Sequence, residues 1–213
     1  MSSPDARLRE DVCRTGASLF TRGLTHGSTG NISVAHPDGG WLMTPTSSSL
    51  GTLDPARLSR LDASGKLIGG DAPTKEAFLH TTMYAKRSKA RAVVHLHSTH
   101  SVAVSCLDGI DHANCLPAIT AYYVMRIGAL PLIPYFPPGD ENLAHAVGVL
   151  ASDHHAVLLA NHGPVVAGAS LSAATDAIEE LEETARLTLM LHGRPIRTLT
   201  PEQVAELRKR FPA

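Results

Sequence analysis

Hydrophobic residues recur at helical spacing over several stretches of the chain. The longest stretch, residues 170–192, has an apolar residue every three or four positions and closes at Gly193, a residue type that commonly ends helices. Its apolar positions are Ala174, Ile178, Leu181, Ala185 and Leu189. The same periodicity predicts helices over residues 5–22, 74–86, 99–106 and 139–152. A last helix is expected from Thr200-Pro-Glu-Gln, which has the form of a capping box.

Short apolar or alternating runs bounded by turn residues predict strands between these helices. We expect strands over residues 31–35, 41–46, 91–97, 156–160 and 165–168, and one more short pair within residues 53–68. Tight turns join several of them, such as Pro37-Asp-Gly-Gly between the first two. Residues 116–133 are apolar but broken by Gly128 and Pro131, so no regular element is predicted there. This pattern indicates an α/β fold with a mixed, mostly antiparallel central sheet covered by helices.

The composition excludes several classes of function. Hydrophobic residues make up 43% of the 213 residues and charged residues 18%, so we expect residues 1–213 to form one globular domain. A net charge of −1, only 4% aromatic residues and no basic cluster argue against nucleic acid as a partner. No apolar run reaches membrane-spanning length, and the first residues lack the pattern of a secretion signal. Three cysteines without metal or redox spacing fit free thiols, so we expect a cytoplasmic protein without a membrane partner.

Two histidines on one predicted strand are the first candidates for chemistry. Successive strand side chains point to opposite faces, so His95 and His97 share a face while Leu96 is buried behind them. His162 follows another buried strand, and Gly163 beside it allows the backbone to approach closely. Three histidines with an open position suit a catalytic divalent metal, with zinc expected first and manganese or cobalt as alternatives. The competing interpretations are histidines bonded only to backbone groups, or a structural zinc site.

Glu76 is a carboxylate at the predicted start of the helix over residues 74–86. A carboxylate in a first helical turn often only stabilises the positive end of the helix dipole. Close to a metal, Glu76 could instead be a general acid/base or a labile fourth ligand.

Three short polar segments carry the groups that bind phosphate. They offer hydroxyls, backbone N–H groups beside small residues, or an ammonium group, and one lies at a predicted helix N-terminus, which attracts anions. The segments are Gly27-Ser28-Thr29-Gly30-Asn31, Thr46-Ser47-Ser48 and Thr74-Lys75. Loops of serine, threonine and glycine are also common without any ligand, so each segment alone is weak evidence.

Across these segments the chain resembles the class II aldolase/adducin family. The similar stretches run in order through nearly the whole length: Ser28-Thr-Gly-Asn-Ile-Ser-Val34, Leu42-Met-Thr-Pro-Thr46, Pro73-Thr-Lys-Glu76, Val93-Val-His-Leu-His97 and Leu159-Ala-Asn-His-Gly163. The resemblance implies a three-layer αβα sandwich and a divalent metal, usually zinc, on His95, His97 and His162. It also implies that Glu76 is the catalytic acid/base. In the three polar segments, it implies that a substrate phosphate binds near Gly30, Asn31, Thr46, Ser47, Thr74 and Lys75. Members are typically homotetramers with active sites at subunit interfaces.

A tyrosine completes the site that the resemblance implies. In the aldolases of the family, a tyrosine in the region of Tyr122 acts from a neighbouring subunit. Here either Tyr122 or Tyr123 could have that role. Packing in the core or at an interface is the ordinary alternative for both side chains.

Within the family, three segments look most like the 3-oxo-tetronate 4-phosphate decarboxylases. They are Pro73-Thr-Lys-Glu76, Ala121-Tyr-Tyr-Val-Met-Arg-Ile-Gly128 and Pro131-Leu-Ile-Pro-Tyr-Phe-Pro-Pro-Gly-Asp140. The likeness implies metal-dependent decarboxylation of 3-oxo-tetronate 4-phosphate to dihydroxyacetone phosphate and carbon dioxide, through a metal-bound enediolate. The sugar-phosphate aldolases differ, with Thr-Gly in place of Thr46-Ser47 and Ser-Ser in place of Thr74-Lys75. The alternative is a sugar-phosphate aldolase or epimerase, similar to fuculose-phosphate aldolase, and a remote one is a non-catalytic adducin-like assembly module.

Overall fold

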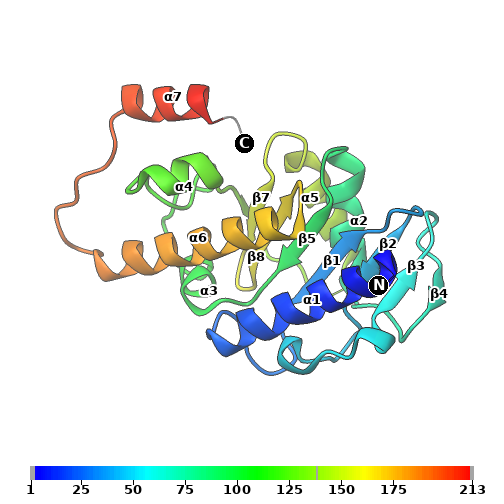
Figure 1. Ribbon diagram of the computed structural model, residues 1–213. Helices are drawn as coiled ribbons and strands as arrows, with labels where there is room; N and C mark the ends of the chain where they lie inside the picture. Colours follow the sequence, from blue (N-terminus) through cyan, green and yellow to red (C-terminus); the bar gives the residue numbers. More distant parts are fainter. Residues whose placement is uncertain (1–2, 138, 212–213) are drawn as a thin grey trace.

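The computed structural model describes residues 3–137 and 139–211, which form an eight-stranded sheet flanked by helices (Figure 1). The strands are β1 (Asn31–Ala35), β2 (Trp41–Met43), β3 (Ser59–Leu61), β4 (Leu67–Gly69), β5 (Ala92–His95), β6 (Leu132–Ile133), β7 (Ala156–Leu159) and β8 (Gly163–Gly168). Their order across the sheet is β4-β3-β2-β1-β5-β8-β7-β6. The pair β6–β7 is parallel and the other neighbouring pairs are antiparallel. This confirms the mixed, mostly antiparallel sheet; Pro138, part of one segment behind the resemblance, lies outside the described residues.

Helices cover both faces of the sheet and give the expected αβα arrangement (Figure 1). One face is covered by α1 (Pro4–Thr21), α3 (Thr99–Ser105), α4 (Ala121–Arg126) and α6 (Leu171–Met190). The other face is covered by α2 (Ala77–Lys86) and α5 (Glu141–Leu150). The last helix, α7 (Pro201–Arg210), packs against α4, and the short 3-10 helices η1 (Leu50–Thr52) and η2 (Pro55–Arg57) pack against α1. None of the helices in the described residues combines the length and hydrophobicity that a membrane span needs.

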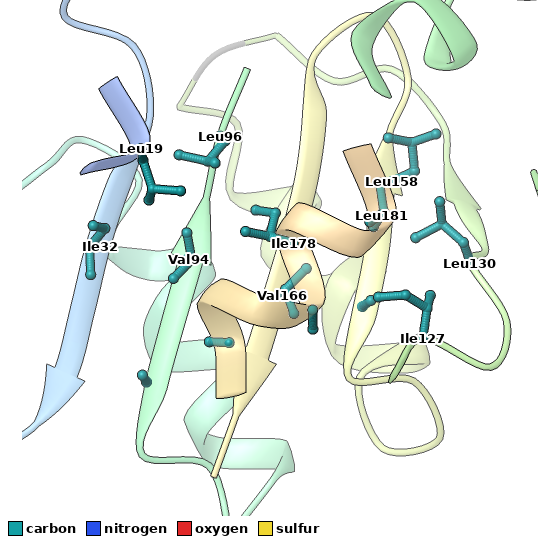
Figure 2. Close-up of a cluster of buried hydrophobic side chains, with 14 of the residues drawn as sticks. Leu19, Ile32, Val94, Leu96, Ile127, Leu130, Leu158, Val166, Ile178 and Leu181 are labelled. Atoms are coloured by element: carbon teal, nitrogen blue, oxygen red, sulfur yellow. The ribbon is translucent and has the colours of Figure 1, made fainter. Parts of the chain in front are cut away.

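Alternation along the central strands divides the core into two layers. Val94 of β5 belongs to the cluster beneath α1 and α6, whereas its neighbour Val93 belongs to the cluster beneath α2 and α5. Figure 2 shows the first cluster, in which Ile178 and Leu181 of α6 lie over the sheet beside Val166. Burying one such side chain contributes about 1.5–3 kcal/mol to folding. Because they are packed on both faces, β5 and β8 are fixed at the centre of the sheet.

Two elements near the predicted histidine site are shorter than the sequence indicates. β5 ends at His95 rather than at residue 97, and α2 begins at Ala77 rather than at residue 74. Residues 72–74 cannot join the helix because their backbone pairs with residues 44–46 instead. As a result, His97 lies two residues beyond the strand, and Glu76 occupies the N-cap position of α2 rather than its first turn.

The structure contains an α-helix, α4, and the short strand β6 in residues 116–133, where the sequence predicts no regular element. Residues 121–126 form α4, which Thr120 caps by accepting a hydrogen bond from the backbone N–H of Tyr123. Six residues are too few for helical periodicity to show in the sequence. By contrast, the capping box at the start of α7 is confirmed, because Thr200 and Gln203 exchange both of the expected hydrogen bonds.

Candidate metal centre

Three histidine side chains converge at one end of the central strands. β8 pairs with β5 on one side and with β7 on the other, so the end of β5 lies beside the β7–β8 turn. His95 closes β5, His97 follows two residues later, and His162 lies in that turn. The Nε2 atoms are 3.2 Å apart for His95 and His97, 3.3 Å for His95 and His162, and 3.0 Å for His97 and His162. All three nitrogens therefore point toward a common centre.

The turn that carries His162 depends on two unusual backbone positions. Asn161 has a φ of 56°, a left-handed conformation that asparagine tolerates better than most residues. Gly163 passes so close to the chain after His95 that an added Cβ would lie 2.3 Å from the carbonyl oxygen of Leu96. The close backbone approach expected at Gly163 is thus confirmed, and it places His162 beside the end of β5.

Glu76 completes the cluster from the opposite direction. Its Oε2 atom lies 3.4 Å from Nε2 of His95, and its Oε1 atom lies 3.2 Å from Nε2 of His162. Although Glu76 is the N-cap residue of α2, its side chain makes no capping hydrogen bond. The carboxylate is directed at the histidines rather than at the helix backbone.

Burial and hydrogen bonding set the protonation states of these groups. Burial lowers the pKa of His95, and its Nδ1 atom lies 2.8 Å from the carbonyl oxygen of Pro164. Nδ1 therefore carries the hydrogen, and Nε2 keeps its lone pair for the centre. Burial and the neighbouring imidazoles lower the pKa of His97 to about 3. Burial raises the pKa of Glu76, but His95, His162 and the amide of Asn31 outweigh it, so this pKa lies well below its usual range.

A divalent cation fits this set of donors. The four ligand atoms of Glu76, His95, His97 and His162 lie within 4.8 Å of one another. Neutral imidazoles and an ionised carboxylate are the forms in which these residues bind zinc and related ions. Without a cation, several lone pairs would face one another in a mostly buried site, which is unfavourable. The donor chemistry therefore matches the divalent-metal site expected from the sequence.

The backbone holds the three polar segments side by side. Thr44 is the link, because it exchanges hydrogen bonds with Ile32 through its backbone N–H and its side-chain hydroxyl. Its carbonyl oxygen also accepts a hydrogen bond from the N–H of Thr74, at 3.2 Å. The N–H of Thr46 donates to the carbonyl oxygen of Ala72, at 2.9 Å. Segments far apart in the sequence thus meet in one loop cluster that leads into Glu76.

The remaining candidate phosphate-binding residues differ in their contacts, backbone conformation and exposure. Gly30 packs against the cluster, since an added Cβ would lie 3.0 Å from the carbonyl oxygen of His95. The Asn31 amide nitrogen is bonded to Oε2 of Glu76, at 2.8 Å, so this side chain faces the carboxylate. Ser47 has a φ of 56°, a conformation that glycine adopts more easily. Lys75 is exposed just before α2.

The two candidate tyrosines have different environments. Tyr123 is fully buried, and its hydroxyl donates a hydrogen bond to Oδ1 of Asn114, at 2.9 Å. Tyr122 is 58% exposed and lies under the guanidinium group of Arg126, which also pairs with Asp176 at 2.9 Å. Of the two hydroxyl groups, the one on Tyr122 is therefore accessible to another molecule.

The sequence did not identify the residues outside the four candidate ligands whose hydrogen bonds hold the segments around the cluster in place. His80 of α2 and Ser33 of β1 are buried and hydrogen-bonded to each other at 2.7 Å. Glu182 of α6 accepts hydrogen bonds from the backbone N–H groups of His100 and Ser101, so it anchors the start of α3 just after His97. The signal for the first pair was present: polar side chains recur on the inward face of a buried strand and inside an apolar helix face. Nothing local in the sequence indicates the second contact.

Comparison with known sequences identifies close relatives along nearly the whole chain. The family described as "Class II Aldolase and Adducin N-terminal domain" matches residues 10–189. A 3-oxo-tetronate 4-phosphate decarboxylase of Escherichia coli K12 is 52% identical over 201 residues, covering 94% of this chain and 95% of that protein. An L-fuculose phosphate aldolase of the same strain is 31% identical over 209 residues, covering 96% and 94%.

Solved structures agree with the sequence comparison. YgbL from Escherichia coli, a candidate aldolase/epimerase/decarboxylase, superposes with a TM-score of 0.95 at 50% identity, covering 97% of this chain and 100% of that chain. An L-fuculose 1-phosphate aldolase superposes with a TM-score of 0.84 at 25% identity, covering 99% and 98%. The expected sandwich fold of this kind is therefore confirmed over essentially the whole described chain.

Proposed function

The chain belongs to the class II aldolase and adducin family, and we propose that it decarboxylates 3-oxo-tetronate 4-phosphate to dihydroxyacetone phosphate and carbon dioxide. The observation that carries the proposal is the contrast in identity: 52% with a decarboxylase of that substrate, against 31% with an L-fuculose phosphate aldolase. The convergence of all four metal-ligand candidates supports catalysis over a non-catalytic assembly role. Fold alone would not decide among these activities.

His95, His97 and His162 would hold a divalent cation, with zinc as our first choice and manganese or cobalt as alternatives, and Glu76 would be a labile fourth ligand. When bound, the cation supplies Lewis-acid polarisation of the substrate ketone next to the bond that breaks. The His95–Pro164 hydrogen bond fixes the ring so that its Nε2 lone pair faces the centre. The protein thus contributes a rigid and mostly buried set of ligands.

Glu76 is the residue that we assign to proton transfer. The bond between carbons 1 and 2 breaks, carbon dioxide leaves, and the electron pair that remains on carbon 2 must take up a proton. The lowered pKa keeps Glu76 ionised, so its carboxylate has a free lone pair with which it can first accept the proton of the hydroxyl on carbon 2. It then returns that proton to carbon 2. The hydroxyl regains a proton from solvent, so one proton is consumed for each carbon dioxide released.

Tyr122 is our candidate for the second proton-transfer group, acting from a neighbouring subunit of a homotetramer. Its exposed position on α4 supports this assignment, whereas the hydroxyl of Tyr123 is already bonded to Asn114. A tyrosine supplied across an interface would deliver the solvent proton to the substrate oxygen. On this proposal the site is complete only in the assembled oligomer.

The loop cluster of Gly30, Asn31, Thr46, Ser47, Thr74 and Lys75 is our candidate for binding the substrate phosphate. The hydrogen bonds through Thr44 that join these segments support a single anion site, and the exposed ammonium of Lys75 adds positive charge. Binding energy from the phosphate would hold the reacting carbons in register with Glu76.

The alternative is a sugar-phosphate aldolase or epimerase on the same metal site, for which the 31% identity with an L-fuculose phosphate aldolase is the specific observation. The test compares kcat/KM for 3-oxo-tetronate 4-phosphate and for L-fuculose 1-phosphate, using one metal-loaded preparation. We expect kcat/KM to be much higher for the tetronate, with carbon dioxide as a product. Preference for the fuculose phosphate, with release of an aldehyde, would move the protein to the aldolases. Inactivity on both substrates would favour the assembly module.

A further inference from the structure

Behind Glu76, four polar side chains form a continuous hydrogen-bonded chain. The amide nitrogen of Asn31 lies 2.8 Å from Oε2 of Glu76, and the amide oxygen of Asn31 is bonded to Nε2 of His80. Nδ1 of His80 lies 2.7 Å from the hydroxyl of Ser33, which lies 2.9 Å from the hydroxyl of Tyr84. Asn31, Ser33 and His80 are buried, so solvent does not compete for these contacts.

This chain of contacts arises because the residue spacings of α2 and β1 match. Glu76, His80 and Tyr84 are four residues apart, so they lie on one face at steps of about 6 Å. Asn31 and Ser33 are two residues apart on one face of β1, a step of about 6.6 Å. Because the two steps are nearly equal, residues from the helix side and residues from the strand alternate along one line that ends at the carboxylate.

Donor and acceptor chemistry gives this line a single direction. Ionised Glu76 can only accept, so Asn31 presents its NH₂ group to Glu76 and its oxygen to His80. That oxygen can only accept as well, so the ring of His80 carries its hydrogen on Nε2. Burial and the nearby His95 lower the pKa of His80 to about 3, so the ring is neutral and Nδ1 accepts from the hydroxyl of Ser33. Burial raises the pKa of Tyr84, which stays protonated and donates to Ser33.

We propose that His80 is a positioning residue for Glu76, because its Nε2–H fixes the amide of Asn31, which in turn fixes the orientation of the carboxylate. The inference rests on the proposed role of Glu76 in proton transfer. His80 is hydrogen-bonded to Asn31 and Ser33, so it acts on the carboxylate through Asn31. Without the Nε2–H donor, the amide can rotate and present its oxygen to the carboxylate, which then loses one hydrogen-bond donor.

A network that only stabilises the fold would make a different prediction. Its loss would lower the free energy of unfolding but leave kcat and metal affinity unchanged in the molecules that remain folded. Loss of a residue that orients a ligand or an acid/base group typically costs about 10- to 100-fold in activity or metal affinity. The two roles are therefore separable by measurements on folded protein.

The first measurement needs no substrate. An NMR spectrum of the histidine ring nitrogens, recorded on ¹⁵N-labelled, metal-free wild-type protein near neutral pH, reports the tautomer of His80. We expect a hydrogen on Nε2 and none on Nδ1. A hydrogen on Nδ1 alone, or on both nitrogens, would overturn the proposal. In the first state His80 could not donate to Asn31, and in the second Nδ1 could not accept from Ser33.

The second measurement compares three variants by kcat, KM and metal affinity. His80→Leu removes the donor, and we expect kcat to fall about 10- to 100-fold, with KM changed less and metal binding weakened. His80→Gln keeps an N–H donor and an acceptor, and we expect it to restore most of both losses. The matched control is His36→Leu, which removes a buried histidine bonded to Asp5 just after β1. We expect the control to keep wild-type kcat.

Each outcome is decisive. A folded, metal-loaded His80→Leu protein with wild-type kcat, or equal kcat losses in His80→Leu and His36→Leu, would overturn the proposal. If the wild-type protein does not turn over the substrate, the proposed function fails, and metal affinity decides the positioning role instead. In that case, weaker metal binding by His80→Leu than by His80→Gln supports the positioning role of His80, and equal metal binding by the two variants overturns it. Should His80→Leu not fold, the tautomer of the wild-type protein decides.

Discussion

At the scale of single residues, the carboxylate of Glu76 has three partners in the cluster. It lies 3.4 Å from Nε2 of His95 and 3.2 Å from Nε2 of His162, and Asn31 donates to it at 2.8 Å. Replacing Glu76 by Gln keeps the shape but removes the basic group. We expect Glu76→Gln to retain bound metal on the three histidines and to lose about 100-fold or more in kcat, the scale of general acid–base catalysis. Metal content and steady-state kinetics measure both quantities.

The control for this variant is Glu206→Gln on α7. Glu206 is exposed and forms an ion pair with Arg210 one turn away, so its replacement should change neither kcat nor metal content. If a metal-loaded Glu76→Gln protein keeps the wild-type kcat, Glu76 does not take part in the proton transfer.

His80 predicts a pH dependence of stability. Its pKa is about 3 in the folded protein, and a histidine in the unfolded chain has a pKa near 6.5. Between these values the unfolded state binds more protons, so the contribution of His80 to stability is lost as the pH falls below 6.5. From pH 6.5 to pH 4.5 the loss is about 2–3 kcal/mol, at about 1.4 kcal/mol for each pKa unit.

Urea unfolding of the metal-free protein at several pH values measures this contribution. We expect the free energy of unfolding of His80→Gln to fall less than that of the wild type over the same interval. Identical pH dependence in the two proteins would show that His80 is not held neutral in the folded state.

His97 lies beyond the strand whose alternation predicted it, but the sequence was sufficient to predict a metal-binding cluster of His95, His97, His162 and Glu76, whose ligand atoms lie within 4.8 Å of one another. It was not sufficient to predict what Asn31 does. The sequence placed it in a segment that could bind phosphate through hydroxyls and backbone N–H groups, and the structure shows that its side-chain amide bonds to Glu76 and His80. That contact depends on how α2 lies against β1, a long-range arrangement that no local pattern records.

At the scale of elements, the β7–β8 turn is the feature on which the cluster depends. An added Cβ on Gly163 would lie 2.3 Å from the carbonyl oxygen of Leu96, so Gly163→Ala must push the turn away from β5. We expect a loss of about 1–3 kcal/mol in the free energy of unfolding, as for other overpacked sites. We also expect weaker metal binding, because His162 moves with the turn. Denaturant unfolding and a metal titration measure the two effects.

Gly69→Ala is the matched control, since it also adds a Cβ to a strand glycine but its nearest neighbour there is 3.8 Å away, on Arg60. Its metal affinity should equal that of the wild type. If Gly163→Ala bound metal as tightly as this control, the turn would not be what positions His162.

Sequence patterns predicted the longer elements well and the short ones poorly. α6 and the strands on either side of the Asn161 turn follow from periodicity and apolar runs. α4 was missed because six residues are too few to show a helical period. The start of α2 was placed three residues too early because the pairing of residues 72–74 with residues 44–46 is a tertiary contact.

At the scale of the whole molecule, the proposed tetramer makes a prediction about shared sites. If Tyr122 acts in the site of a neighbouring subunit, Glu76→Gln and Tyr122→Phe damage different halves of each site. Co-expressing the two inactive variants lets their subunits mix, and some sites then combine an intact Glu76 with an intact Tyr122. For random assembly about a quarter of the sites are intact, so we expect about a quarter of the wild-type activity.

The control mixes Glu76→Gln with the double variant that carries both substitutions, which cannot form an intact site and should stay inactive. If the mixed tetramers of Glu76→Gln and Tyr122→Phe are no more active than the mean of the two unmixed variants, Tyr122 does not act in the site of a neighbouring subunit. Tyr123→Phe provides a second comparison, because it removes only the bond to Asn114 and should lower stability rather than kcat.

The central claim is that this cluster of histidines and Glu76 carries out a metal-dependent decarboxylation. Its most direct test measures carbon dioxide and dihydroxyacetone phosphate together, from 3-oxo-tetronate 4-phosphate generated in situ. The protein is first stripped of metal and then restored with zinc or manganese. We expect equal amounts of the two products from the restored protein and neither from the stripped protein. Products that form regardless of metal, or no carbon dioxide from a fully loaded protein, would contradict the account.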